Sequence, residues 1–300
     1  MHEYVYLQDV EAAIAAHRPV VALESTLITH GFAYPRNVQT ATQIAQAVIE
    51  AGAQPATVAV LGGIVRIGLA PDEVESLGAN KSARKCSVRD LGIVAGLGLD
   101  GSTTVAATMF IAARAGIAVF ATGGIGGVHR GHPFDVSADL TELGRTPVTV
   151  VCAGPKALLD LPLTFEHLET LGVPVIGYGT DEIPAFYSRS SGLRADIRVD
   201  DPADLAAVIQ ARRAMGLPGG ELVCVPVPAD AELPRDTAEQ AIVAAQRLAD
   251  EQGIHGAAST PFLLDQIARL TRGASVRANI ALLINNARVA SQLAGALAAS

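Results

Sequence analysis

The sequence is poor in aromatic side chains and in positive charge. Phenylalanine, tyrosine and tryptophan make up 4% of its 300 residues, and tryptophan is absent altogether. So few rings offer no platform on which the bases of a single-stranded nucleic acid could stack. The 22 Lys and Arg residues are outnumbered by 30 Asp and Glu, which gives a net charge of −8. A nucleic-acid polymer is therefore not an expected partner, because its phosphates require a basic surface.

Cysteine and long apolar runs are also scarce. The three cysteines, at positions 86, 152 and 224, are odd in number and widely spaced. This pattern is typical of free thiols in a reducing compartment, not of a disulfide framework or a zinc site. No apolar run is long enough to cross a bilayer, and residues 1–10 have neither a basic leader nor an apolar signal core. We therefore expect a cytoplasmic protein without a membrane partner.

The composition is sufficient for a large core, since half of the residues are hydrophobic and 17% are charged. Short β-branched runs alternate with longer alanine-rich stretches, which predicts an α/β protein, and we take residues 1–300 as one domain. The expected strands are residues 20–23, 57–61, 118–121, 148–152, 175–176, 197–199 and 222–225. The clearest expected helices are residues 37–51, 103–115, 203–215, 236–252, 261–270 and a long final one from about residue 275.

A carboxylate stands at the end of the first expected strand. Glu24 follows a fully apolar run and is itself followed by Ser25 and Thr26. Enzymes of the α/β class bind their ligands at the carboxyl ends of strands, so Glu24 is a candidate acid–base residue. A helix cap or a solvated carboxylate is the simpler alternative.

A glycine-rich loop follows the strand at residues 118–121. It has four glycines in the five positions 123–127, and His129 and Arg130 come next. Glycines let backbone N–H groups approach an anion closely, so this loop is a candidate site for a phosphate or a sugar. It matches neither of the common nucleotide-loop patterns. A tight turn would explain two of the glycines, but not four followed by His-Arg.

Two carboxylates and a hydroxyl lie just downstream of that loop, at Asp135, Asp139 and Ser137. Asp135 is a candidate helix N-cap, which would place Asp139 in the first helical turn. Isolated oxygen ligands of this kind suit Mg²⁺ or Mn²⁺ with several retained waters, and they do not suit zinc.

The chain has three lysines, Lys81, Lys85 and Lys156. Lys156 follows an apolar strand and a Gly-Pro turn. A lysine among apolar residues loses its proton more readily, because desolvation disfavours the ammonium, and the free amine is a nucleophile. Most lysines instead extend to solvent. Lys85 lies in a basic stretch, residues 83–90, which could hold a phosphate dianion or form a solvated face.

Amides interrupt the apolar pattern of the long final helix, at Asn279, Asn285 and Asn286. Buried amides require hydrogen-bond partners. A bound substrate is one possible partner.

Taken together, these segments resemble the pseudouridine-5′-phosphate glycosidase family, which includes indigoidine synthase A-like proteins. The resemblance extends from residues 19–26 to residues 285–286; its most specific stretches are residues 119–130, 134–140 and 150–156, and residues 259–264 give further support. It implies an enzyme that reversibly cleaves the carbon–carbon glycosidic bond of pseudouridine 5′-phosphate to uracil and ribose 5-phosphate. This activity, also called pseudouridylate synthase, belongs to the hydro-lyases.

The same resemblance implies roles for individual residues. Lys156 would form a Schiff base with the ring-opened ribose, Glu24 would be the general acid, and Asp139 would hold one Mn²⁺ per subunit largely through water. The positions that line the substrate pocket would be Lys85, Thr104, Val105, Thr122, His129, Ser137 and Asn279. The implied fold is a three-layer α/β/α sandwich around a mixed sheet, and the implied assembly is a homotrimer.

Two other functions stay open at this point. The first is a Schiff-base aldolase or lyase for another sugar phosphate, which would use the same lysine but release no uracil. The second is a phosphosugar-binding regulatory module in which Lys156 is only an anion ligand. Borohydride trapping separates the enzymes from the module, because only an enzyme of this type becomes labelled at Lys156.

Overall fold

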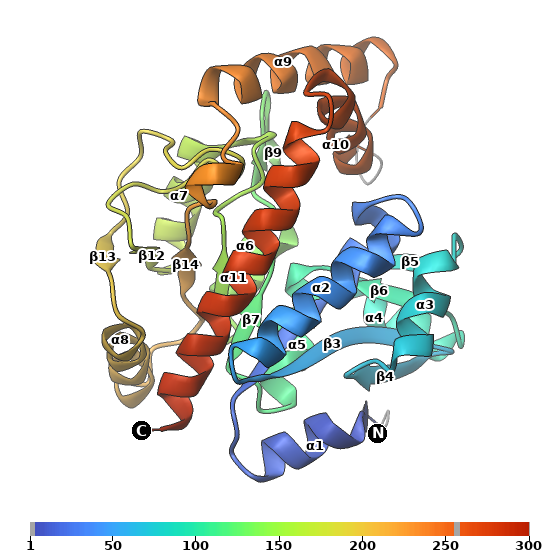
Figure 1. Cartoon of the computed structure of the whole chain (residues 1–300), viewed down its shortest axis with the longest axis vertical. Coiled ribbons are helices and arrows are strands. Elements are labelled where there is room, and N and C mark those ends of the chain that lie inside the picture. The colour runs from blue at the N-terminus through green and yellow to red at the C-terminus, as the bar shows by residue number, and fades with distance from the viewer. Residues whose placement is uncertain (1–3, 255–258, 300) are drawn as a thin grey trace.

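The computed structural model describes residues 4–254 and 259–299, which form one large mixed sheet between two layers of helices (Figure 1). The central path of the sheet has the order β1-β4-β3-β2-β7-β10-β14-β12-β13, with β6 beside β3 and β5 beside β6. The strands of this sheet are β1 (Tyr4–Tyr6), β2 (Val20–Glu24), β3 (Gln54–Leu61), β4 (Ile64–Ile67), β5 (Arg84–Cys86), β6 (Gly101–Thr103), β7 (Val119–Ala121), β10 (Thr149–Cys152), β12 (Val175–Tyr178), β13 (Ile197–Val199) and β14 (Leu222–Cys224).

The run from β3 through β2, β7, β10, β14 and β12 to β13 is parallel, whereas β4 and β6 both pair antiparallel with β3. Parallel strands need helical crossovers, and the resulting sheet is covered on both faces. The helices are α1 (Gln8–Ala15), α2 (Arg36–Glu50), α3 (Pro71–Ala79), α4 (Val88–Gly96), α5 (Val105–Arg114), α6 (Ala138–Leu143), α7 (Leu161–Thr170), α8 (Pro202–Ala214), α9 (Arg235–Glu251), α10 (Ser259–Leu270) and α11 (Ala274–Ala298).

Strand β2 shows how each face is buried. Its side chains alternate, so that Val21 and Leu23 enter the core formed with α2, α8 and α11, while Val20 and Ala22 enter the core formed with α1 and α5. Helix α11 runs across one face beside α2 (Figure 1). The predicted three-layer α/β/α sandwich with a mixed sheet is therefore confirmed.

A second, smaller sheet connects two of the loops that leave the large one. It consists of β8 (Val128–His129), β9 (His132–Val136) and β11 (Leu159–Asp160), in the order β11-β8-β9. Both pairings are antiparallel. The loop after β7 is thereby joined to the loop after β10.

All seven expected strands and all six expected helices are present, with ends displaced by a few residues. The short elements β5, β6, β8 and β11 were not predicted, because two or three residues are too few to show a hydrophobic period. The prediction that Asp135 caps a helix is wrong. Asp135 lies in β9, and Ser137 caps α6, where its hydroxyl accepts a hydrogen bond from the Asp139 N–H at 3.2 Å. The capping role therefore falls to the neighbouring hydroxyl residue.

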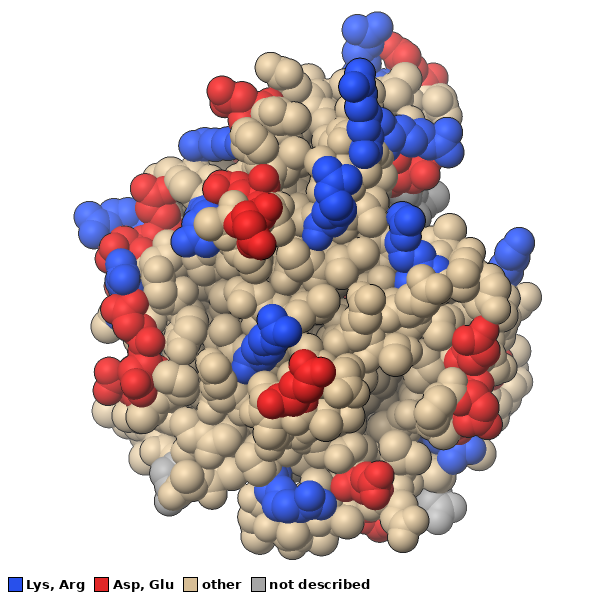
Figure 2. Space-filling view, in the orientation of Figure 1, with Lys and Arg blue, Asp and Glu red and all other residues tan. Residues whose placement is uncertain are grey.

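The surface agrees with the low positive charge of the chain. Acidic and basic side chains are scattered over the face shown in Figure 2, much of which is uncharged, and no continuous basic stripe crosses that face. Among the residues that the structure describes, no helix combines the length and the apolar character that a membrane crossing requires.

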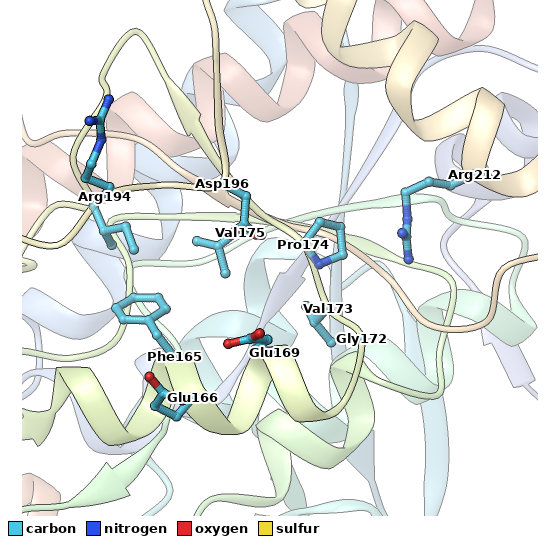
Figure 3. Close-up of a pocket in the computed structure, with 11 residues that line it drawn as sticks. Phe165, Glu166, Glu169, Gly172, Val173, Pro174, Val175, Arg194, Asp196 and Arg212 are labelled. Carbon is cyan, nitrogen blue, oxygen red and sulfur yellow. The ribbon is translucent and has the colours of Figure 1, made fainter.

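A buried ion pair fixes α8 to the sheet. Arg212 Nε donates to Glu221 Oε1 at 3.0 Å, and the Thr149 hydroxyl donates to Glu221 Oε2 at 2.8 Å. The Glu221 side chain is 4% exposed. Arg212 also borders a cavity of about 400 Å³ at the amino end of β12 (Figure 3). Both carboxylate oxygens of Glu221 thus depend on protein partners.

We expect Arg212→Ala to lower the free energy of unfolding by about 3 kcal/mol, because the substitution leaves the buried Glu221 carboxylate without its cation. Urea denaturation monitored by circular dichroism measures this change. Arg198→Ala is the matched control, since Arg198 pairs with Asp181 and Asp200 at the exposed surface and its loss should change stability little. Equal denaturation midpoints for Arg212→Ala and the unmodified protein would contradict the expectation.

Candidate active site

The principal cavity has a volume of about 640 Å³ and lies at the carboxyl ends of the central parallel strands. Glu24 ends β2, Thr122 follows β7, and Lys156 belongs to the turn after β10. Because these three strands are parallel neighbours, their ends bring the three side chains together. The cavity is lined by every residue to which the family resemblance assigned a role: Glu24, Lys85, Thr104, Val105, Thr122, His129, Ser137, Asp139, Lys156 and Asn279.

The cavity beside Arg212 contains none of these residues. Lys81 is exposed and does not line the principal cavity, which separates it from Lys85 and Lys156. Two of the three amides of α11 serve the fold: Asn285 donates to the Pro226 carbonyl, and Asn286 donates to the Thr122 carbonyl at 2.8 Å.

Glu24 is held by Thr122, whose hydroxyl donates to Glu24 Oε1. Burial raises the pKa of Glu24, while the positive charge of Lys156 and the Thr122 hydrogen bond act in the opposite direction. The net effect is a raised pKa. Glu24 therefore keeps its proton to a higher pH than an ordinary glutamate and can act as a proton donor.

The backbone around Lys156 is tied to the glycine-rich loop. Lys156 N–H donates to the Ile125 carbonyl at 3.0 Å, and Leu159 N–H donates to the Lys156 carbonyl at the same distance. A Cβ atom at Gly124 would lie 2.8 Å from the carbonyl oxygen of Gly154. Glycine is required there because the two loops pass in direct backbone contact.

Arg130 clamps the segment that follows Lys156. Its Nε donates to the Leu159 carbonyl at 3.1 Å, and its Nη2 donates to the Ala157 carbonyl at 3.0 Å. The same guanidinium forms a two-pronged ion pair with Glu239 of α9. The sequence placed Arg130 beside the loop but gave it no role of its own, since its partners lie far along the chain.

Asp139 joins the glycine-rich loop to the start of α5. Its Oδ1 accepts from Ala106 N–H at 2.9 Å, and its Oδ2 accepts from Gly126 N–H at 2.8 Å. A Cβ atom at Gly126 would lie 2.9 Å from Asp139 Oδ2 and closer still to Ser137 Oγ. Two separate segments thus converge on one carboxylate that is 6% exposed.

The donor groups suit a hydrated ion better than a directly bound metal. Among the described residues there is no group of three or more His, Cys, Asp or Glu side chains that could hold a metal. Each Asp139 oxygen already accepts one backbone N–H and has one further lone pair for a water molecule. Asp135 is the more accessible carboxylate of the cavity, with Oδ2 at 3.3 Å from His129 Nδ1. Manganese binding stays a prediction.

The remaining polar groups are arranged to receive an anion. Thr104 and Ser137 cap the N-termini of α5 and α6, where the helix dipole is positive. Lys85 reaches the same cavity from β5, and burial together with the charge of Lys156 lowers the pKa of Lys85. His30 also lines the cavity, although the sequence gave it no role.

Comparison with known proteins identifies relatives along the whole chain. A sequence model of the family described as Indigoidine synthase A like protein matches residues 9–296. The pseudouridine-5′-phosphate glycosidase of Paracoccus denitrificans is 55% identical over 296 residues, which cover 97% of each chain. That of Caldanaerobacter subterraneus subsp. tengcongensis is 52% identical and covers 98% of this chain and 97% of its own.

Two solved structures have the same fold. The prealnumycin C-glycosynthase AlnA, in complex with ribulose 5-phosphate, superposes with a TM-score of 0.92 at 40% identity and covers 100% of this chain and 98% of its own. An indigoidine synthase A-like protein from Thermotoga maritima superposes with a TM-score of 0.90 at 34% identity and covers 98% of this chain and 96% of its own. The chain therefore belongs to the indigoidine synthase A-like protein family.

Proposed function

We propose that this protein cleaves the carbon–carbon glycosidic bond of pseudouridine 5′-phosphate to give uracil and ribose 5-phosphate. The observation that carries the proposal is the position of Glu24 and Lys156 at the carboxyl ends of β2 and β10, the two strands that flank β7, where both line one cavity with polar groups suited to an anion. The names of relatives that are more than 50% identical over nearly the full length support it.

The substrate dictates an unusual form of glycosidase chemistry. Ordinary glycosidases protonate an oxygen or nitrogen leaving group, but the uracil of pseudouridine is attached through carbon and that bond has no lone pair. Glu24 instead donates its proton to the ribose ring oxygen. The bond between this oxygen and the first carbon of the sugar breaks with its electron pair on oxygen, and the Lys156 amine bonds to that carbon.

The second half of the reaction releases the base. The Lys156 nitrogen first gives a proton to the Glu24 carboxylate, and the carbon–carbon bond then breaks with its electron pair moving to the uracil ring carbon, which takes that proton from Glu24. The nitrogen of Lys156 becomes doubly bonded to the sugar carbon. Water then hydrolyses this protonated imine, which frees ribose 5-phosphate, restores the amine and returns a proton to Glu24. The sequence of steps is reversible.

The other residues of the cavity bind and orient the substrate. Lys85 and the Val105 N–H at the start of α5 hold the phosphate, and Asn279 and His129 line the sugar and base. A divalent ion such as Mn²⁺, held by Asp135 and by Asp139 through water, would polarise an oxygen of the substrate when bound. We also propose a cytoplasmic homotrimer of single-domain subunits, which rests on the family resemblance of the sequence.

The C-glycosynthase in complex with ribulose 5-phosphate favours this function over an aldolase or a regulatory module. Its name describes C-glycoside chemistry, and its ligand is a pentose phosphate. The two chains are 40% identical over 98% of the length of the C-glycosynthase, and we extend both features to this protein as support for the proposal.

Replacement of the nucleophile provides the first test. We expect Lys156→Ala to reduce uracil release by about a thousandfold or more, because the other lysine of the cavity, Lys85, is assigned to the phosphate and not to the sugar carbon. Uracil is quantified chromatographically after incubation with pseudouridine 5′-phosphate and Mn²⁺. Borohydride with ribose 5-phosphate should label the unmodified protein but not Lys156→Ala. Lys81→Ala, which changes an exposed lysine, is the matched control and should keep both properties. Labelling of Lys156→Ala at full yield would contradict the proposed mechanism.

The pH dependence tests Glu24. A proton donor loses activity as the pH rises through its pKa, so the alkaline limb of the kcat/KM profile reports Glu24. The Thr122 hydroxyl lowers the pKa of Glu24 by stabilising the carboxylate, which opposes the effect of burial. Thr122→Val should therefore raise that pKa further and move the alkaline limb to higher pH. Thr170→Val, on the exposed surface of α7, should leave the limb in place. A shift of the Thr122→Val limb to lower pH is the contrary result.

The phosphate provides a third test. A phosphate bound far from the reacting carbon supplies binding energy that the reaction uses. We expect kcat/KM for pseudouridine to be about a hundredfold lower than for its 5′-phosphate, since a charge-assisted contact is lost. In Lys85→Ala the difference in kcat/KM between the two substrates should become smaller, because only the phosphorylated substrate loses a contact. Equal turnover of the two substrates by the unmodified protein contradicts the proposed phosphate site.

A further inference from the structure

The hydrogen-bond ladder between β7 and β10 changes its pattern at Thr122. Thr122 N–H donates to the Val151 carbonyl at 3.0 Å. In a regular parallel ladder the carbonyl of the same residue accepts from the residue two positions further along the partner strand, which here is Ala153. Ala153 N–H instead donates to the Gly123 carbonyl at 2.9 Å. The Thr122 carbonyl thus loses the donor that the ladder would supply.

Asn286 of α11 replaces that donor. Its Nδ2 donates to the Thr122 carbonyl at 2.8 Å, across 164 positions of the chain. A carbonyl only accepts, so this bond determines which end of the amide faces it. The Asn286 side chain is fully buried, and within the part of the chain that the structure describes its Oδ1 has no hydrogen-bond partner. Because a half-satisfied buried amide is costly, stability alone does not explain an amide at this position.

Thr122 connects this bond to the catalytic acid, since the Thr122 hydroxyl donates to Glu24 Oε1. The N–H and the carbonyl of Thr122 are held by Val151 and Asn286, so the backbone that carries the hydroxyl is fixed at both groups. Without Asn286 the carbonyl would be a buried acceptor with no donor, which favours a rotated backbone. The direction of the Thr122 hydroxyl therefore depends on Asn286.

We propose that Asn286 is a positioning residue, which holds Thr122 in the orientation that the Glu24 carboxyl group requires. The role rests on the proposed function, in which Glu24 is the proton donor. Asn286 is not among the described residues that line the cavity, so it acts through Thr122 and not on the substrate. Asn285, the next amide of α11, donates to the Pro226 carbonyl at 3.3 Å and has no such connection to Glu24.

A double-mutant cycle tests whether Asn286 acts through Thr122. Asn286→Leu removes the donor with little change in side-chain volume. We expect it to lower kcat/KM for pseudouridine 5′-phosphate about tenfold, because the hydrogen bond to the acid is weakened. In a Thr122→Val background the same substitution should change kcat/KM by about twofold or less, since the hydroxyl is already absent. Asn285→Leu is the matched control and should leave kcat/KM unchanged in both backgrounds.

The pKa of Glu24 provides a second measurement, and it needs no substrate. A weaker Thr122 hydrogen bond stabilises the carboxylate less, so Asn286→Leu should raise this pKa in the same direction as Thr122→Val. Carbon-13 NMR of protein labelled at its glutamate carboxyl groups follows the titration, and Glu24→Gln assigns the signal. The other charged groups that act on Glu24 stay in place in both variants: Lys156, Asp139 and Lys85.

Equal loss of kcat/KM on Asn286→Leu in the two backgrounds would assign Asn286 to the fold alone and overturn the proposal. An unchanged pKa of Glu24 in Asn286→Leu would overturn it as well. Asn286→Ala, which removes the donor without adding an apolar branch, gives the same comparisons if Asn286→Leu does not fold. Failure of the unmodified protein to release uracil is a different outcome. It would remove the proposed function, whereas the pKa of Glu24 would still report whether Asn286 orients Thr122.

Discussion

The two hydrogen bonds that Asp139 accepts hold the catalytic cavity together. One comes from the first turn of α5 and the other from the glycine-rich loop after β7, so a single carboxylate joins segments that the sheet alone would leave independent. Its negative charge is stabilised at the N-terminus of a helix. The close approach also explains why position 126 has no side chain, since a Cβ atom there would collide with Ser137 and Asp139. These two segments of the cavity wall are thereby fixed by the fold itself.

Desolvation acts on the acid and on the base of this cavity in opposite directions. It raises the pKa of Glu24 and lowers that of Lys85, because burial disfavours whichever form is charged. Nearby charges of opposite sign partly restore the ionised forms, whereas Lys156 lowers the pKa of Lys85 further and Asp139 raises that of Glu24 further. A carboxyl group that keeps its proton near a lysine is the combination that protonation of a ring oxygen and attack by an amine require together. The apolar cores on both faces of the sheet therefore contribute to the chemistry as well as to stability.

The sequence was sufficient for those features that lie within one continuous segment. Apolar runs predicted the strands that end at Glu24, Thr122 and Lys156, and the parallel arrangement of an α/β sheet then predicts that their ends meet. It was insufficient for features that join distant segments. Thr29 and Ser102 are 73 positions apart, and Arg130 and Glu239 are 109 apart, so no local pattern could predict either contact. The prediction of the helix cap was wrong for a different reason. Asp135 and Ser137 are both common capping residues and lie two positions apart, and only the observed start of α6 shows which of them is the cap.

The roles proposed for Glu24 and Lys156 agree with how the fold holds each side chain. Glu24 sits at the end of a buried strand and is held by Thr122, so its carboxyl group has little freedom, as transfer of a proton to a fixed ring oxygen requires. Lys156 has a flexible four-carbon stem on a backbone that Ile125 and, through residues 157–159, Arg130 keep in place. When the sugar ring opens, its first carbon moves, and an amine on a flexible stem can follow that carbon while the backbone stays fixed. A rigid acid paired with a mobile nucleophile is thus suited to a reaction in which one substrate atom is stationary and the other is displaced.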